Sequence, residues 1–244
     1  MKSSNPEAGR SPGYGIVERE SSADATSRHV ERIRLLGYTV VPSGLALERV
    51  AELGERLATV WRAQVEEFGG EARMSAIGDS LTVRCPLAYD DAFLEPATNP
   101  DVLAICRHLI GPYVILMQQN GVINPPRQSH TQVAYHRDLP YQHFVSTRPL
   151  AISALFCIDE FRADNGATTL LPGSHRVEAF PSDPVAAELD TPVTAPPGSF
   201  IVFDSMVFHR AGTNHSERAR RAINQVFSAP VIAQQISLPR PMVK

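Results

Sequence analysis

Apolar residues in the first part of the chain recur at the three- and four-residue spacing of amphipathic helices. One helix is predicted from near Asp24 to Leu36, with Gly37 as its C-cap, and residues 38–41 then predict a short strand. A longer helix is predicted to follow, because its apolar positions share one face while charged residues occupy the other. That apolar face, which we expect in the core, contains Val50, Leu53, Leu57, Val60 and Trp61.

A third helix carries sequence signals at both of its ends. Asn99 suits the N-cap position, and Pro100 follows at the first helical position, where a backbone N–H is not needed. Gly111 and Pro112 mark the end of the helix, because neither residue favours its continuation.

From Tyr113 onward the pattern changes to short β-type runs separated by Pro and Gly turns. The runs cover residues 113–119, 131–136, 150–158, 168–172, 199–204 and 222–227. Several short strands at this spacing favour an antiparallel sandwich or barrel. Strands do not alternate with long helices, which argues against a doubly wound sheet. The expected fold is therefore mainly β with flanking helices.

The length of 244 residues suits one sizeable domain. We expect this domain over residues 23–244, with a helical part over 23–112 and a β core over 113–230. Residues 1–22 are rich in Ser, Gly, Pro and charge, which predicts a flexible tail.

The composition limits which kinds of molecule the protein is expected to bind and in which compartment it is expected to lie. The chain is 43% hydrophobic and 20% charged with a net charge of -3, so no nucleic-acid or membrane partner is indicated. The sequence contains no apolar run long enough to span a bilayer and no signal peptide. The three cysteines, Cys85, Cys106 and Cys157, are widely separated, which predicts a reducing cytoplasm. We expect a small-molecule ligand and a monomer or homodimer.

His136 and Asp138 are the first candidates for chemistry. On an extended segment, residues two apart point to the same side, so both side chains can reach one metal ion. The chain has 8 His and 26 acidic residues among 244, so about one His-x-carboxylate triplet is expected by chance. Taken alone, the triplet is equally compatible with an ion pair in a loop.

His209 and Arg220 strengthen the prediction of a metal site. His209 is predicted to end a hydrophobic strand, and Arg220 begins the next strand eleven residues later. Two imidazoles and one carboxylate on one face of an octahedral ion leave three positions, two for a 2-oxo acid and one for dioxygen. A fixed arginine suits the distal carboxylate of a diacid, which a tetrahedral zinc site does not need.

Five stretches together resemble the phytanoyl-CoA dioxygenase family of iron(II)- and 2-oxoglutarate-dependent oxygenases. They are GYTVVPSGL (37–45), NPDVLAICRHLIGPY (99–113), YHRD (135–138), IDEFRADNGATTLLPGSHR (158–176) and PGSFIVFDSMVFHRAGTNHSERARRA (197–222). The resemblance runs from about Gly37 to Phe227, and the ordered set is far more specific than any one motif.

The resemblance implies a double-stranded β-helix, which is a cupin-like jelly roll. It places the metal ligands on His136, Asp138 and His209 and the 2-oxoglutarate carboxylate anchor on Arg220. Arg221 would then face the opposite way. Two further cosubstrate contacts are carried over: Ser153 on the strand 150–158, and Gln119, which is preferred to its neighbour Gln118.

The resemblance also implies the cofactors and the reaction. These are Fe(II), 2-oxoglutarate and O2, with hydroxylation of an unactivated C–H and release of succinate and CO2. Asp138 argues against halogenation, because halogenating relatives carry a small residue there. Desaturation, ring closure and epimerisation stay open. The polar segment 119–144 favours a small polar metabolite or natural-product intermediate over a long acyl chain.

Two other classes of function remain. One is a metal-dependent hydrolase or isomerase on a cupin-like barrel, and the other is a non-catalytic jelly-roll binding protein. Several nearby residues have structural as well as functional readings. We expect His175 to be a structural turn residue, His215 to be solvated and Arg137 to point away from the metal. His130 and His143 either face the substrate or are surface residues. Arg84 either reaches the mouth of the pocket or forms a surface salt bridge.

Overall fold

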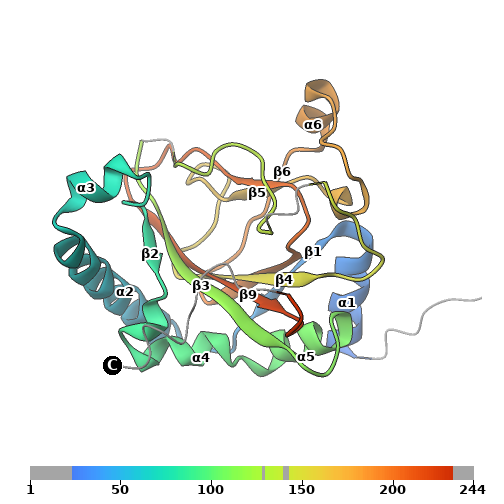
Figure 1. The fold of residues 1–244 in the computed structure, drawn as a ribbon, viewed down its shortest axis with the longest axis horizontal. Helices are drawn as coiled ribbons and strands as arrows, with labels where there is room; N and C mark the ends of the chain where they lie inside the picture. Colours follow the sequence, from blue (N-terminus) through green and yellow to red (C-terminus); the bar gives the residue numbers. More distant parts are fainter. Residues whose placement is uncertain (1–23, 128–129, 140–142, 233–244) are drawn as a thin grey trace, which may run out of the picture.

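A computed structural model of the chain describes residues 24–127, 130–139 and 143–232 (Figure 1). Two antiparallel sheets make up the body of the fold, and helices cover one side of the larger sheet. The tail predicted over residues 1–22 lies outside the described residues. The expectation of a mainly β fold with flanking helices is confirmed.

The larger sheet has six strands, and each strand pairs with its neighbours in antiparallel fashion. Their order across the sheet is β1 (Tyr38–Pro42), β7 (Ser199–Asp204), β4 (Ala151–Cys157), β9 (Arg220–Ser228), β3 (Ile115–Asn124) and β2 (Thr82–Arg84). The smaller sheet has the order β6 (Thr191–Pro192), β5 (Thr168–Leu170) and β8 (His209–Ala211). Neighbouring strands are mostly distant in the chain, so the connections pass between the sheets.

The helices lie mainly in the first part of the chain. They are α1 (Ala25–Leu36), α2 (Leu47–Phe68), α3 (Glu71–Ala76), α4 (Leu94–Ala97), α5 (Pro100–Leu109) and α6 (Asp183–Leu189), with 3-10 turns η1 (Pro86–Ala88), η2 (Asp91–Phe93) and η3 (Ser174–Arg176). The predicted caps Asn99 and Gly37 are confirmed, since Asn99 accepts hydrogen bonds from N-terminal N–H groups of α5 and Gly37 ends α1 at φ 88°. Asp24, near which the first helix was predicted to begin, is its N-cap. Within the described ranges, no helix combines the length and apolar character that crossing a membrane requires.

Some local predictions were wrong. Residues 131–136 form only an isolated bridge through His136 rather than a strand, and the strand before His209 ends at Asp204. The helix α6 and the strands β2, β6 and β8 were not predicted. These strands have two or three residues each, which is too short for an alternating pattern to appear in the sequence.

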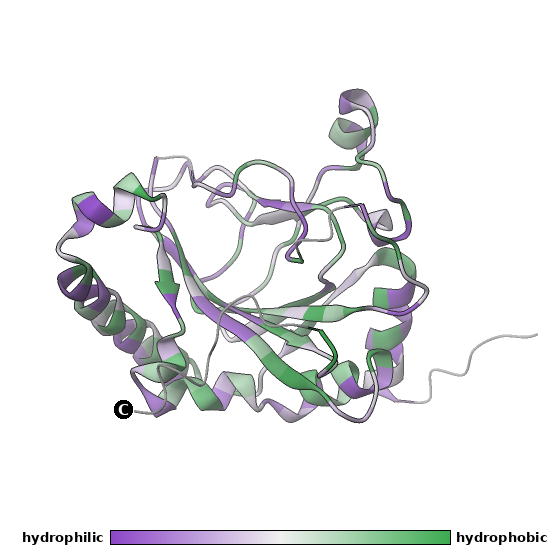
Figure 2. Cartoon of the chain, viewed as in Figure 1, coloured by the Kyte–Doolittle hydropathy of each residue, from purple (hydrophilic) through white to green (hydrophobic). Residues whose placement is uncertain are grey.

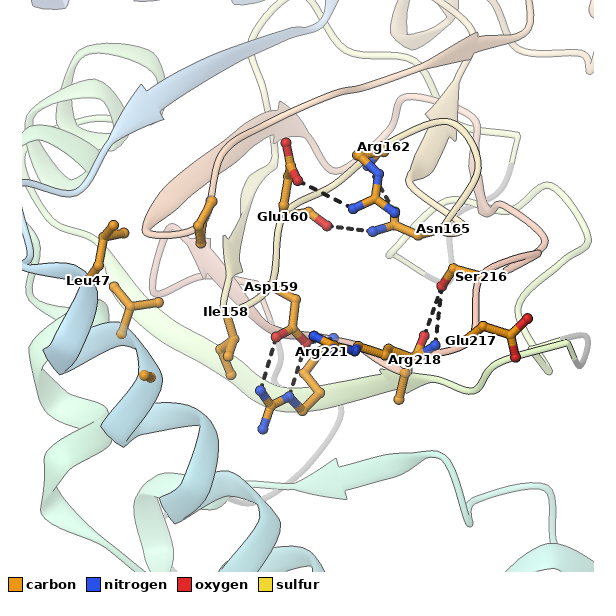
Figure 3. Close-up of a pocket in the computed structure, with 14 residues that line it drawn as sticks. Leu47, Ile158, Asp159, Glu160, Arg162, Asn165, Ser216, Glu217, Arg218 and Arg221 are labelled. Carbon is orange, nitrogen blue, oxygen red and sulfur yellow. Dashed lines mark hydrogen bonds and ion pairs between the residues drawn. The ribbon is translucent and has the colours of Figure 1, made fainter.

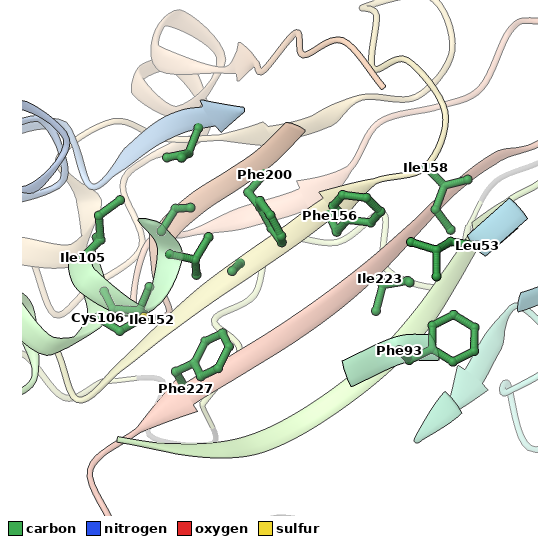
Figure 4. Packing of buried hydrophobic residues seen from close by; sticks show 14 of the residues in the cluster. Leu53, Phe93, Ile105, Cys106, Ile152, Phe156, Ile158, Phe200, Ile223 and Phe227 are labelled. Atoms are coloured by element: carbon green, nitrogen blue, oxygen red, sulfur yellow. The ribbon is translucent and has the colours of Figure 1, made fainter. Parts of the chain in front are cut away.

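The main core lies between the helices and the outer face of the six-stranded sheet. Ile152 and Phe156 of β4 and Ile223 of β9 are buried there, and Figure 4 shows Ile152 beside Ile105 and Cys106 of α5. The intervening residues Leu155 and Ala222 instead face the smaller sheet. Figure 2 shows both hydrophobic and hydrophilic residues along α2 and β3, as expected of elements with two different faces.

Close approach of α2 to the sheet depends on Gly121 in β3. A Cβ atom at this position would lie 2.6 Å from Leu57 Cδ1 and 2.9 Å from Val83 Cβ. Both neighbours are fully buried, so neither can move without disturbing the core. The glycine therefore sets how closely the helical layer packs on the sheet.

Gly121→Ala should lower the free energy of unfolding by about 1–3 kcal/mol, because the added methyl overpacks the core. Urea unfolding followed by circular dichroism measures this loss. Combining Gly121→Ala with Leu57→Ala should cost less than the sum of the two single losses, because the second change makes room for the first. Additive losses would contradict the steric explanation.

Candidate metal centre

Three side chains predicted as metal ligands meet between the two sheets. One potential ligand atom from each of His136, Asp138 and His209 lies within 4.8 Å of the other two. The two imidazole rings are 4.4 Å apart, and His209 Nε2 lies 3.4 Å from Asp138 Oδ1. Within the described part of the chain, no other group of at least three His, Cys, Asp or Glu residues has this proximity.

Backbone hydrogen bonds hold the three residues together. The N–H of His136 donates to the carbonyl oxygen of His209 at 2.9 Å, and the N–H of His209 donates back at 3.0 Å. The N–H of Asp138 donates to the carbonyl oxygen of Ser205 at 3.0 Å. The segment that carries His136 and Asp138 is therefore attached directly to β8 and to the end of β7.

The histidine rings are oriented by the chain itself. Nδ1 of His136 lies 3.0 Å from the carbonyl oxygen of Ala134, and Nδ1 of His209 lies 3.0 Å from that of Val207. A carbonyl oxygen only accepts, so in the neutral imidazole Nδ1 carries the proton. Nε2 of each ring is then left with its lone pair, which is the form that binds a metal ion.

Charge within the cluster also suits a cation. Burial opposes ionisation of Asp138, but the adjacent His209 and His136 and a hydrogen bond from Ser153 outweigh it and lower the pKa of the carboxyl. Burial likewise opposes protonation of His209, but Asp138 outweighs it and raises the pKa of that ring. Burial and the neighbouring His209 lower the pKa of His136. Asp138 is thus ionised at neutral pH.

A cavity of about 100 Å³ opens beside the cluster. Polar side chains from three strands line it: Arg84 of β2, Gln118 and Asn120 of β3, and Arg220 and Asn224 of β9. Arg84 forms an ion pair with Asp79 at 2.5 Å and also lines the cavity, so it both makes a salt bridge and reaches the pocket, which were the two alternatives expected for it. The cavity is therefore polar and predominantly basic next to the cluster.

Arg220 is the most deeply buried cation of this cavity, with 2% of its surface exposed. Its Nη2 donates to the carbonyl oxygen of Gly166 at 2.9 Å, and its guanidinium lies 4.1 Å from the centre of the Phe161 ring. Burial lowers the pKa of Arg220 to about 10, so the group stays charged at neutral pH. Among the described residues no carboxylate forms an ion pair with it, and its Nε has no hydrogen-bond partner.

Arg221 points to the opposite face of β9, as predicted. Its guanidinium binds both oxygens of Asp159, at 2.9 and 3.0 Å. This pair lines a separate cavity of about 600 Å³ over the N-terminal part of α2 (Figure 3). The larger cavity contains no histidine, and Arg162 in it is paired with Glu160, so it lacks the metal-binding character of the smaller one.

Gln119, the residue preferred for a cosubstrate contact, faces away from the cavity. Its Oε1 accepts from the N–H of Leu87 at 3.1 Å, and its Nε2 donates to the carbonyl oxygen of Phe93 at 3.0 Å. A β-bulge between Leu116 and Gln118 shifts the alternation of β3, and Gln118 lines the cavity instead. The choice between the two glutamines was therefore wrong.

Ser153 also differs from its predicted role as a cosubstrate contact. Its hydroxyl donates to Asp138 Oδ2 and lies 2.8 Å from the hydroxyl of Ser205. Ser153 is fully buried and sits behind the carboxylate rather than in the cavity. The sequence did not single out Ser205 or Asn224, because neither residue type signals a contact with a metal ligand.

The remaining candidates divide between structural and exposed positions. His175 is buried against the carbonyl oxygen of Arg34, as expected of a structural turn residue. Arg137 points away from the cluster and stacks on Phe208 at 4.0 Å. His130 is buried, and this burial, together with the smaller effect of the Arg220 charge, lowers its pKa to about 4. His143 and His215 are exposed.

Comparisons with known proteins identify the family of the chain. The sequence profile of the family described as phytanoyl-CoA dioxygenase (PhyH) matches residues 33–222. The uncharacterized protein Rv1501 of Mycobacterium tuberculosis is 33% identical over 92% of this chain and 82% of its own length. Dioxygenase af480 of Aspergillus fumigatus is 27% identical over 80% of this chain and 64% of its own length.

Solved structures show the same fold. The crystal structure of EctD from S. alaskensis with 2-oxoglutarate and 5-hydroxyectoine aligns with a TM-score of 0.68 at 21% identity. The alignment covers 88% of this chain and 80% of that one. The fold is thus the cupin-like jelly roll that the sequence predicted.

Gln119→Leu should lower the free energy of unfolding by about 1–3 kcal/mol, because it leaves buried backbone groups of Leu87 and Phe93 without partners. Gln118→Leu, at a half-buried position on the other face, is the matched control and should unfold close to the wild type. Urea unfolding of both variants measures the difference. The reverse ranking would mean that the two side chains exchange faces in solution.

Proposed function

The chain belongs to the phytanoyl-CoA dioxygenase family, and we propose that it is a non-haem iron(II)- and 2-oxoglutarate-dependent dioxygenase. The observation that carries this proposal is the proximity of the His–Asp–His cluster to Arg220, a buried cation without an acidic partner among the described residues. The cluster alone suits several metal enzymes. The adjacent unpaired cation favours one that also binds an anion beside its metal.

His136, Asp138 and His209 fit an iron(II) ion. Both Nε2 atoms are available because the Nδ1 atoms bond to backbone carbonyls, and the carboxylate is ionised. Two imidazoles and a carboxylate form the donor set of non-haem iron(II) oxygenases, which leaves open positions on the ion. A cation in the cluster would also replace the proton that Asp138 favours on His209.

Arg220 fits the distal carboxylate of 2-oxoglutarate. Stacking on Phe161 and the bond to Gly166 fix the plane of its guanidinium, so its remaining N–H groups have a set direction. A fixed guanidinium binds a carboxylate through two parallel hydrogen bonds, which a mobile lysine does not do. Gln118 is now the candidate on β3 for a further polar contact in the cavity.

When bound, iron(II) and 2-oxoglutarate supply the oxidising chemistry for attack on an unactivated C–H, with succinate and CO2 as the other products. We propose hydroxylation, since Asp138 occupies the ligand position that would otherwise be open to a halide. The polar lining favours a small polar metabolite or natural-product intermediate as the substrate.

We further propose that the protein has no nucleic-acid or membrane partner. It would be a monomer or homodimer in the reducing cytoplasm. The three cysteines are buried and free, which suits a compartment where disulfides do not form. The net charge of -3 gives no reason for binding to polyanions.

Anaerobic addition of iron(II) and 2-oxoglutarate should produce a weak visible charge-transfer band from a chelated 2-oxo acid. His136→Ala should abolish both the band and iron binding, because one imidazole ligand is removed. Absorption spectroscopy with parallel metal analysis measures both. A wild-type protein that binds the metal but gives no band would contradict the cosubstrate assignment and favour a hydrolase, isomerase or binding protein.

Arg220→Gln should weaken 2-oxoglutarate binding by about 10- to 100-fold, because hydrogen bonds to a charged group contribute roughly 1.5–3 kcal/mol. Arg221→Gln is the matched control, since it removes the adjacent arginine from the other face of β9. Titration of the charge-transfer band at fixed iron(II) gives both affinities. Equal affinity for Arg220→Gln and the wild type would exclude Arg220 as the anchor.

A further inference from the structure

The two carboxylate oxygens of Asp138 have different surroundings. Oδ1 faces the other ligands and lies 3.4 Å from His209 Nε2. Oδ2 accepts one hydrogen bond from the hydroxyl of Ser153 and another, at 3.4 Å, from Nδ2 of Asn224. The carboxylate is therefore held in one rotational position, with one oxygen toward the cluster and the other toward β4 and β9.

A second hydroxyl supports the first. The hydroxyls of Ser153 and Ser205 are 2.8 Å apart, and each carries one proton. The ionised carboxylate of Asp138 can only accept, so the Ser153 proton points to Oδ2. The proton between the two serines must then come from Ser205. The chain of donation runs from Ser205 to Ser153 to Asp138, and this order follows from proton counting alone.

Ser205 holds Asp138 in two ways. Its carbonyl oxygen accepts from the N–H of Asp138 at 3.0 Å, and its hydroxyl reaches the carboxylate through Ser153. Ser153 and Ser205 are both fully buried, so water does not compete for these hydrogen bonds. Ser153 lies in the middle of β4, where pairing with β7 and β9 on both sides fixes its backbone.

We propose that Ser153 and Ser205 are positioning residues that make Asp138 a monodentate metal ligand through Oδ1. This inference rests on the proposed function in one respect, namely that the cluster binds iron(II). Binding through both oxygens would require Oδ2 to turn away from Ser153 and Asn224, and it would occupy one more position on the ion. With Oδ2 held back, three positions stay open, which the binding of a 2-oxo acid and dioxygen requires.

The test measures iron(II) affinity in the absence of cosubstrate and oxygen. Ser153→Ala should weaken iron(II) binding by about 10- to 100-fold, as is usual when a group that orients a metal ligand is removed. Ser205→Ala should weaken it less, because Ser153 can still donate to Oδ2. Ser228→Ala is the matched control, since this buried serine lies in β9 and its hydroxyl donates to the carbonyl oxygen of Ala229 rather than to the cluster. It should bind iron(II) as the wild type does.

The double variant Ser153→Ala/Ser205→Ala provides the sharper result. Because Ser205 acts on the carboxylate through Ser153, the double variant should bind iron(II) no more weakly than Ser153→Ala alone. Losses that add in the double variant would overturn the donation chain. Metal affinities equal to the wild type in both single variants would overturn the proposal as a whole.

Thermal unfolding of the metal-free proteins separates positioning from a purely structural role. A structural role would lower the melting temperature of the serine variants and leave the iron(II) affinity of the folded protein unchanged, which would contradict the proposal. If Ser153→Ala does not fold, the iron(II) affinity and melting temperature of Ser205→Ala are compared with those of Ser228→Ala, and this comparison tests the proposal in the same way. A wild-type protein that binds no iron(II) would refute the proposed function, whereas normal wild-type binding with unaffected variants refutes only this inference.

Discussion

Backbone pairing between the segment 130–139 and the sheets is the constraint on which the candidate site depends. The reciprocal hydrogen bonds of His136 and His209, with the bond from Asp138 to Ser205, bring together residues that lie far apart in the chain. The side chains then need little further adjustment, because carbonyl oxygens two residues earlier orient both imidazoles. The site is thus built mainly by main-chain geometry, and the side chains supply the chemistry.

The six-stranded sheet separates the metal-side cavity from the helical layer. The alternation of side chains along each strand decides which residues face the cavity and which face the helices. On β9, Arg220 enters the metal-side cavity while Arg221 pairs with Asp159 on the helical side. On β3, Gln118 lines the cavity while Gln119 satisfies backbone groups of the helical layer. A shift of one residue in either strand would exchange these roles, so the register of the sheet is a functional property of this protein.

The sequence predicted the parts of the structure that carry strong local signals. The caps Gly37 and Asn99 were correct because capping depends on a single residue and its immediate neighbours. His136, Asp138, His209 and Arg220 converge as expected because their ordered motifs are specific. Gln119 and Ser153 were placed wrongly for physical reasons: a bulge in β3 is invisible in a run without alternation, and the partner of a buried hydroxyl depends on residues distant in sequence.

The ligand cluster also spans a long stretch of chain. Roughly 70 residues separate Asp138 from His209, and bringing the ends of such a loop together costs conformational entropy. An ion bound by all three side chains acts as a cross-link that closes this loop, much as a disulfide does in a secreted protein. An ion in this cluster would therefore join the segment 130–139 to β8 of the small sheet, and metal occupancy would become part of the folding equilibrium.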